Sequence, residues 1–181
     1  MNDKNRISRV ITRTGDQGET GLADGSRWPK DAPVIVALGE LDELNAMIGV
    51  LRSQPGADDY PLLDEIQQRL FDLGAELAVP GTSRLNEADV LALEAAVSEW
   101  NASLAPLREF VLPGGHSAAA WCHLCRTVAR RAERALVAAQ HQQALNPLSL
   151  QWLNRLSDLL FVLARHINYR QGTAEPQWRP R

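Results

Sequence analysis

Apolar residues recur at steps of three and four in five separate segments of this 181-residue chain. Such spacing matches the turn of an α-helix and predicts helices at about residues 33–51, 61–79, 87–104, 117–142 and 149–170. Steps of three and four also favour shallow crossing angles between packed helices, as in helical bundles. No segment shows sustained alternation of apolar and polar residues, so we predict an all-α fold.

Residues that commonly start or stop helices support these boundaries. Asp31 is a candidate N-cap for the first helix and Asn86 for the third, while Pro80 and Gly81 end the second. The first 30 residues are polar and Gly-rich and are predicted to be extended. We therefore expect one domain with three parts, an N-terminal segment (1–30), a helical bundle (31–171) and a loose C-terminal tail (172–181).

Composition narrows the class of protein. Hydrophobic residues make up 45% of the chain, which is enough for a substantial core. The net charge of −3 and the pI of about 5.8 disfavour a nucleic-acid-binding domain, which is more often basic. No run of about 18 apolar residues predicts a membrane span, and the first residues lack the apolar core of a secretory signal. We expect a cytoplasmic protein.

The two cysteines, Cys122 and Cys125, form a C-x-x-C motif. This motif can be half of a zinc site or a redox pair. Here it lies inside a helical pattern, and no second C-x-x-C or matching His pair follows. We therefore favour two small packing residues one helical turn apart and predict no metal site.

Residues 117–142 contain a cluster of arginines, with Arg126, Arg130, Arg131, Glu133 and Arg134 within nine positions. Because a helix advances about 100° per residue, three of these side chains fall within an arc of roughly 60°. Arginine makes forked contacts with phosphate or carboxylate, and a glutamate among the cations can orient them. A solvated basic helix face is an equally open interpretation.

Residues 12–21, TRTGDQGETG, form a polar loop with Lys30 a short way on. Threonine hydroxyls, glycine amides and a lysine suit a polyphosphate, because glycine lets successive N–H groups face one anion. The P-loop pattern is absent. Considered alone, the segment is more simply a flexible N-terminal loop.

Two helical segments carry polar stripes beside their apolar ones. Residues 39–49, GELDELNAMIG, place Asp42 and Asn45 on one stripe, and the glycines at both ends would permit close approach of a ligand or another backbone. Within residues 153–165, Asn154 lies on a stripe offset from the leucines. The first stripe could equally be an exposed acidic face. Asn154 in the second stripe could equally form a hydrogen bond to a neighbouring helix.

Together, the segments TRTGDQGETGL, WPKD, GELDELNAMIG, FVLPGG, RTVARRAER and LNRLSD resemble the PduO-type family of ATP:cob(I)alamin adenosyltransferases in order and spacing over residues 9–170. The resemblance implies a five-helix bundle with ferritin-like up-down packing, assembled as a homotrimer with ATP and corrin sites between subunits. It implies transfer of the 5′-deoxyadenosyl group of ATP to the cobalt of cob(I)alamin, with Mg²⁺ as cofactor. The expected partners are a Co(II) reductase and an adenosylcobalamin-dependent acceptor enzyme.

The resemblance also assigns roles to residues. Its ATP-binding positions are Thr12, Arg13, Thr14, Gly15, Thr20, Gly21, Lys30, Arg130, Arg131, Glu133, Arg134 and Asn154. Arg130, Asn154 and Phe110 are expected to act in catalysis, with Phe110 against the lower face of the corrin. Asp42 is expected to pair with Arg126 across the subunit interface. Leu22-Ala23-Asp24 departs from the family pattern, which often has an aromatic residue and glycines there.

Three other classes of protein fit the sequence less well. A ferritin-like di-iron protein needs Glu-x-x-His pairs, and the sequence contains none. A non-enzymatic corrinoid carrier would keep Phe110 but would not need the triphosphate-binding residues. A nucleic-acid-binding bundle is disfavoured by the pI and by Glu133 within the basic stripe. The reaction that the resemblance implies needs no catalytic Ser, Cys or His, because Co(I) is itself a strong nucleophile.

Overall fold

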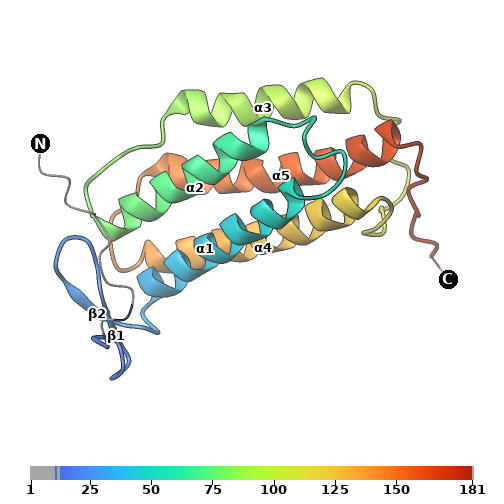
Figure 1. Ribbon diagram of the computed structural model, residues 1–181. Coiled ribbons are helices and arrows are strands. Elements are labelled where there is room, and N and C mark those ends of the chain that lie inside the picture. The colour runs from blue at the N-terminus through green and yellow to red at the C-terminus, as the bar shows by residue number, and fades with distance from the viewer. Residues whose placement is uncertain (1–10, 12, 181) are drawn as a thin grey trace, which may run out of the picture.

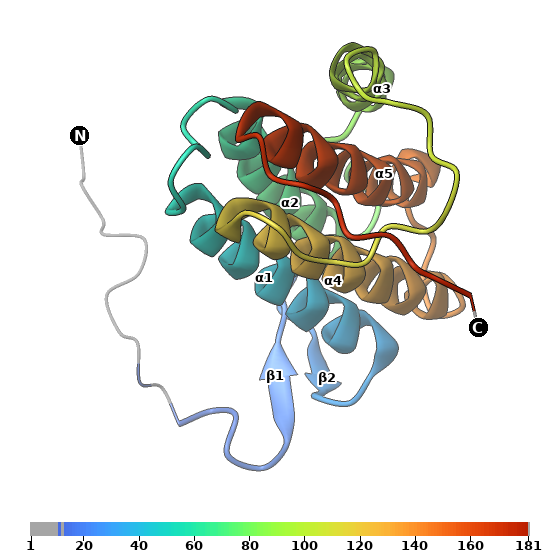
Figure 2. The same cartoon turned by 90° about the vertical axis from the view of Figure 1, so that its right-hand side faces the viewer.

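The computed structural model describes residues 11 and 13–180, and these form an up-down bundle of helices with a small β-hairpin (Figure 1). The helices are α1 (Pro33–Arg52), α2 (Leu62–Ala78), α3 (Glu87–Asn101), α4 (Ser117–Ala139) and α5 (Pro147–Arg170). Helices α1, α3 and α5 run in one direction, and α2 and α4 run in the other. Figure 2 shows α1, α2, α4 and α5 as a four-helix core, with α3 outside it against α5. The predicted all-α, five-helix bundle is confirmed.

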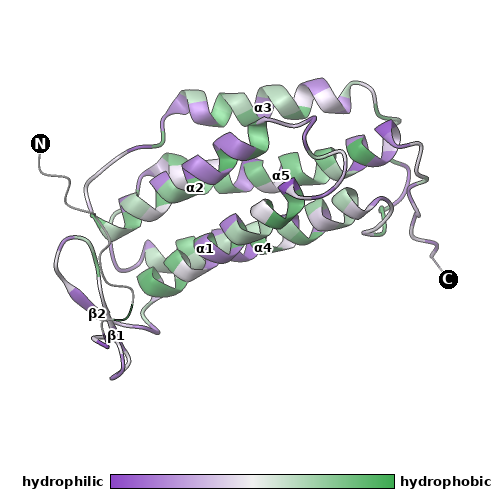
Figure 3. Ribbon diagram, viewed as in Figure 1, coloured by the Kyte–Doolittle hydropathy of each residue, from purple (hydrophilic) through white to green (hydrophobic). Residues whose placement is uncertain are grey.

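The core follows from the apolar spacing. Along α5, Leu153, Leu156, Leu160 and Leu163 are fully buried, and hydrophobic stretches occur along every helix of the bundle (Figure 3). Because the apolar residues of each helix lie on one face, packing those faces together removes them from water. No helix in the described part of the chain has the length and hydrophobicity needed to cross a bilayer.

Cys122 and Cys125 lie inside this core as free thiols with no exposed surface. Burial raises the pKa of both thiols, to about 12 for Cys125. No group of three or more His, Cys, Asp or Glu side chains among the described residues could hold a metal ion. Both cysteines thus lie among the packed side chains of the core, and the prediction that they bind no metal stays a prediction.

The helix ends differ slightly from the predictions. Asn86 caps α3 as expected, since its side chain accepts a hydrogen bond from the amide of Ala88 at 2.9 Å. The prediction of Asp31 as a cap is wrong, because Ala32 occupies the N-cap of α1 and makes no side-chain hydrogen bond there. Helix α5 begins two residues before the predicted start, since Pro147 fits the first helical position, where no amide hydrogen is needed.

The segment predicted to be extended contains a hairpin of strands β1 (Glu19–Gly21) and β2 (Arg27–Pro29), paired antiparallel with Thr20 opposite Trp28. Gly25 supplies the left-handed conformation in the turn, with φ of 87°. Strands of three residues are too short to give an alternating pattern, so the sequence did not reveal them. The hairpin projects from the end of the bundle where α1 begins (Figures 1 and 2).

The tail after Gly172 was predicted to be loose, but residues 173–178 lie along the segment before α4. The amide of Leu112 donates to the carbonyl of Pro176 at 2.8 Å, and the amide of Trp178 donates to the carbonyl of Phe110 at 2.8 Å. Arg165, buried in α5, forms an ion pair with Glu175 at 3.2 Å. The tail thus supplies the counter-charge that a buried arginine requires.

A buried carboxylate ties α2 to α5. Glu76 accepts hydrogen bonds from the amides of Arg84 and Leu85, from the hydroxyl of Ser149 at 2.9 Å and from the side chain of Asn146 at 3.3 Å. Only 6% of Glu76 is exposed. Its charge is compensated by these donors, and the loop between α2 and α3 is held against the start of α5.

Candidate functional site

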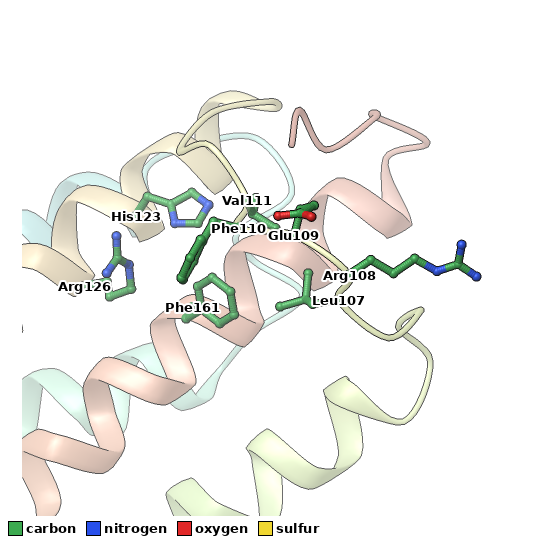
Figure 4. Close-up of a pocket in the computed structure, with 8 residues that line it drawn as sticks. All are labelled: Leu107, Arg108, Glu109, Phe110, Val111, His123, Arg126 and Phe161. Atoms are coloured by element: carbon green, nitrogen blue, oxygen red, sulfur yellow. The ribbon is translucent and has the colours of Figure 1, made fainter. Parts of the chain in front are cut away.

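A cavity of about 400 Å³ opens at the end of the bundle where α4 begins. It is lined by Leu107, Arg108, Glu109, Phe110, Val111, His123, Arg126 and Phe161. In Figure 4, the side chains of Phe110, His123, Arg126 and Phe161 gather around one space, while Arg108 extends away from it. A mostly apolar cavity with a few polar groups is typical of a site for an organic ligand.

Phe110 lies on the irregular segment between α3 and α4 and is 78% exposed. Its ring meets Trp178 of the tail edge-on, with centroids 6.3 Å apart. Phe110 therefore does not belong to the hydrophobic core. The tail fixes its backbone, and a flat apolar ring is left accessible at the cavity.

The Pro-Gly-Gly break before α4 is shaped around Asn168, which is fully buried in α5. The Asn168 side chain accepts from the amide of His116 at 2.9 Å and donates to the carbonyl of Gly114 at 3.1 Å. Gly115 has φ of 99°, and a Cβ atom there would overlap the Asn168 side chain. Sequence reasoning missed Asn168, although it fixes the segment that leads from Phe110 into α4.

His123 and Arg126 bring polar atoms into the cavity from the same face of α4. His123 is 2% exposed, and neither of its ring nitrogens has a hydrogen-bond partner among the described residues. Burial, and secondly the charge of Arg126, lower the pKa of His123 to about 4. The Nε of Arg126 is likewise buried without a described partner, and burial lowers the pKa of this guanidinium. The three-residue spacing from Arg126 was the signal that could have identified His123.

The remaining arginines of α4 divide into two groups. Arg131 forms ion pairs with Glu40, at 2.5 Å, and with Glu43 on α1. Arg130 and Arg134 are exposed, and neither guanidinium forms an ion pair within the described part of the chain. Arg131 thus holds α4 to α1, whereas Arg130 and Arg134 remain available to an anion.

Glu133 and Asn154 meet between α4 and α5. Asn154 donates a hydrogen bond to Glu133 at 3.1 Å and accepts one from Arg155 at 2.7 Å. Both residues are half-buried. Glu133 therefore orients an amide of α5, rather than the neighbouring arginines as the sequence suggested.

The N-terminal loop is ordered by its own cations. Lys30 lies against Gly15, where a Cβ atom would be 3.1 Å from the lysine Nζ. Arg27 donates to the carbonyl of Thr14 at 2.8 Å. Arg13 adopts a left-handed conformation, with φ of 59°, which is uncommon for a non-glycine residue. Thr20 and Gly21 belong to β1, whereas Thr12 lies outside the described residues.

The polar stripe on α1 has two parts. Asn45 is buried and exchanges hydrogen bonds with Gln67 of α2, at 2.9 Å and 3.2 Å, so this residue connects two helices. Asp42 is exposed and forms no ion pair with any described residue. Gly39 has open space around it rather than a close neighbour.

A single chain does not bring the predicted site residues together. The hairpin projects from the end of the bundle where α1 begins (Figure 1), whereas the cavity opens at the end where α4 begins. Within residues 13–180, no hydrogen bond or ion pair joins the N-terminal loop to Arg130, Glu133 or Asn154, and none joins Asp42 to Arg126. The N-terminal loop and the predicted site residues of α4 and α5 therefore form separate surfaces of one subunit.

Comparison with known proteins gives consistent matches over nearly the whole chain. Residues 10–167 match a family model described as cobalamin adenosyltransferase. The chain is 51% identical over 176 residues to a cobalamin adenosyltransferase of Cupriavidus metallidurans, with 96% of each chain covered. It is 39% identical over 178 residues to a corrinoid adenosyltransferase of Bacillus subtilis, covering 94% of this chain and 92% of that protein.

Solved structures show the same similarity. One is a variant of the PduO-type ATP:corrinoid adenosyltransferase from Lactobacillus reuteri, complexed with cobalamin and ATP. It matches with a TM-score of 0.88 and 32% sequence identity, covering 94% of this chain and 97% of that chain. A second variant of that protein, complexed with ATP, matches with a TM-score of 0.88 and 33% identity, covering 94% and 100%.

Proposed function

Because this chain belongs to the cobalamin adenosyltransferase family, we propose that it transfers the 5′-deoxyadenosyl group of ATP to the cobalt of cob(I)alamin and releases triphosphate. The observation that carries this proposal is the exposed ring of Phe110 at an apolar cavity, on the segment that leads into α4, together with the unpaired Arg130 on α4 itself. A flat apolar group before α4 and a cationic group on α4 suit a corrin and a triphosphate, respectively. The structural relative bound to cobalamin and ATP supports the pairing.

We assign the triphosphate to Arg130 and Arg134, and the nucleotide also to Asn154, whose orientation Glu133 fixes. Arg131 supports this surface through Glu40 and Glu43 rather than through ATP. The N-terminal loop, including Arg13, Thr14, Gly15 and Lys30, would contribute from a neighbouring subunit, and Thr12 is assigned to the same loop by resemblance alone.

The separation of these two surfaces supports a homotrimer. A closed ring joins one surface of each subunit to a different surface of the next, so every interface can complete one site. Asp42 and Arg126 would then pair between subunits, which gives the partly buried guanidinium of Arg126 a counter-charge.

Magnesium is expected to bind together with ATP. Among the described residues there is no cluster of three or more acidic, His or Cys side chains for a metal ion. Mg²⁺ is often held by one or two carboxylates together with substrate phosphates. Mg²⁺ is therefore expected to bind to the triphosphate of ATP. The side chains of the protein stabilise the negative charge that develops on the leaving triphosphate.

The chemistry is a nucleophilic displacement. Co(I) attacks the 5′ carbon of ATP, a cobalt–carbon bond forms, and the electron pair of the breaking C–O bond leaves on the triphosphate. Arg130, Arg134 and Lys30 can stabilise that growing negative charge. Holding the 5′ carbon close to cobalt contributes the entropic part of the rate enhancement. Phe110 would cover the lower face of the corrin, exclude an axial ligand and favour the electron-rich Co(I) state.

One assay tests the proposed function directly. Protein, ATP, Mg²⁺ and chemically reduced cobalamin are incubated, and the visible spectrum is followed for a cobalt–carbon bond while triphosphate is measured. We expect one triphosphate for each adenosylcobalamin formed. Binding of corrinoid without triphosphate release would indicate a carrier instead.

A cytoplasmic location, a Co(II) reductase and an adenosylcobalamin-dependent acceptor enzyme remain predictions.

Phe110→Ala is expected to leave the fold and ATP binding intact and to slow adenosylation. Losing the contacts of one large apolar side chain costs about 1.5–3 kcal/mol, which is roughly a tenfold to hundredfold effect on rate. The effect should be largest when the reaction starts from Co(II), because water can then reach the metal. Electron paramagnetic resonance with wild-type protein and ATP should show four-coordinate Co(II), and the variant should lack that signal.

The control for this prediction is Leu91→Ala on α3, which removes another exposed apolar side chain, 54% exposed. Its adenosylation rate should equal that of wild type. If Phe110→Ala lowered the melting temperature and kept the four-coordinate signal, the ring would have only a structural role.

Arg130→Ala is expected to weaken the use of ATP. A charge-assisted hydrogen bond is worth about 1.5–3 kcal/mol, so kcat/KM for ATP should fall roughly tenfold to hundredfold while the corrinoid KM stays unchanged. Arg170→Ala is the matched control, because it removes an exposed arginine whose ion pair with Asp59 is also exposed. Wild-type kinetics for the Arg130 variant would exclude it from the ATP site.

A further inference from the structure

His123 lines the cavity with a polar side chain to which the proposed reaction assigns no role. It is 2% exposed, it lines the cavity together with Phe110 and Phe161, and neither ring nitrogen has a partner among the described residues. Leaving a buried donor or acceptor unpaired is costly, so such a group usually meets a ligand or water. The only described ring contact of His123 is apolar, an edge-on contact with Phe161 at 6.1 Å between centroids.

The surroundings restrict the chemistry of a group that could meet His123. Burial and the nearby Arg126 keep the imidazole neutral, with a pKa of about 4. A neutral imidazole offers one donor and one acceptor, and which nitrogen carries the proton depends on its partner. The positive charge of Arg126 disfavours a cation. In the proposed trimer Arg126 pairs with Asp42 of the partner subunit, so a carboxylate would lie unpaired against the apolar walls formed by Phe110, Val111 and Phe161.

A primary carboxamide meets these requirements. It is neutral, and it has both an N–H donor and a carbonyl acceptor, so it can pair with either tautomer of His123. Corrinoids carry primary amides around the edge of the ring. Since Phe110 and His123 face the same space (Figure 4), a corrin lying on Phe110 would bring part of its edge towards His123.

We propose that His123 binds one peripheral carboxamide of the corrinoid and thereby sets the rotation of the ring above Phe110. This inference rests on the proposed function, because it takes the cavity to be the corrin site. His123 is a positioning residue here: it holds the substrate through an amide and takes no part in bond making at cobalt.

The first test compares His123→Phe with wild type. Phenylalanine keeps the ring shape and the contact with Phe161 but removes both polar nitrogens. Loss of one neutral hydrogen bond should raise the KM for cob(I)alamin roughly threefold to tenfold, with the KM for ATP unchanged. His123→Gln, which keeps a donor and an acceptor, should recover part of the loss. His141→Phe is the matched control, since His141 is exposed beyond the end of α4.

The second test changes the substrate. Cobalamins in which a single peripheral amide has been hydrolysed to a carboxylate are compared one by one. Wild-type protein should discriminate against one of them by a similar threefold to tenfold factor, and His123→Phe should lose that discrimination. Combining the protein variant with the modified substrates identifies the amide that His123 contacts. A general loss of stability would not remove the discrimination against one particular substrate.

The outcomes separate the two proposals. Absence of adenosylcobalamin with wild-type protein would overturn the proposed function itself. An active wild type, together with a His123→Phe variant whose corrinoid KM is unchanged, would overturn only the role of His123. Equal increases in the KM values for ATP and corrinoid would also overturn it, because they would indicate a structural role.

Discussion

Replacing Asp42 or Arg126 with alanine is expected to cost about 3–5 kcal/mol of subunit association, because either change leaves the other charge buried and unpaired in the assembled protein. Within one subunit Asp42 is exposed, whereas the Nε of Arg126 is buried without a described partner. Sedimentation velocity should show the wild type as the proposed trimer and both variants dissociating at the same protein concentrations.

The charge-swapped protein, with Asp42→Arg and Arg126→Asp together, should regain part of the lost association. Glu65→Ala is a suitable control, since Glu65 is an exposed carboxylate on α2 without a described ion pair. Two single variants that stay trimeric and fully active would show that this pair does not hold the assembly together.

Glu76→Ala is expected to lower the free energy of unfolding by about 3–5 kcal/mol. The substitution removes the acceptor for the amides of Arg84 and Leu85 and for the side chains of Asn146 and Ser149. Each buried donor left unsatisfied costs about 1–3 kcal/mol, and water entering the new space offsets part of the sum. Urea denaturation followed by circular dichroism measures this loss.

Two further variants make the Glu76 prediction specific. Glu76→Gln keeps one acceptor oxygen and should lose less stability than the alanine variant. Glu99→Ala removes an exposed carboxylate at the end of α3 and should change stability by no more than about 0.5 kcal/mol. An alanine variant of Glu76 as stable as the wild type would mean that the four donors find other partners.

The bundle was predictable from the sequence because each helix buries a continuous apolar face, and that face is encoded in the local spacing of leucine and alanine. The candidate site was only partly predictable. The spacing places Arg130 and Arg131 about 100° apart, but only the packing of α4 on α1 decides that Arg131 meets Glu40 and Glu43 while Arg130 faces outward.

Features that depend on contacts between distant segments were not encoded locally. Gly115 accommodates Asn168, and Glu175 neutralises the buried Arg165, yet neither relation leaves a periodic signal in the sequence. For this reason the tail was predicted to be loose, although the amide of Trp178 donates a hydrogen bond to the carbonyl of Phe110. The spacing of His123 from Arg126 places both on one helix face, but the two unsatisfied ring nitrogens of His123 are recognised only when the burial of single atoms is known.

The location of the two thiols has a practical consequence for spectroscopy. Because Cys122 and Cys125 are inaccessible and burial raises the pKa of each, maleimide reagents should not modify them in the folded protein. A cysteine introduced at an exposed position of the tail, such as Ala174, can therefore carry a single fluorophore or spin label in an otherwise native background. Distance measurements from that label would follow the tail beside Phe110 as ATP and corrinoid bind.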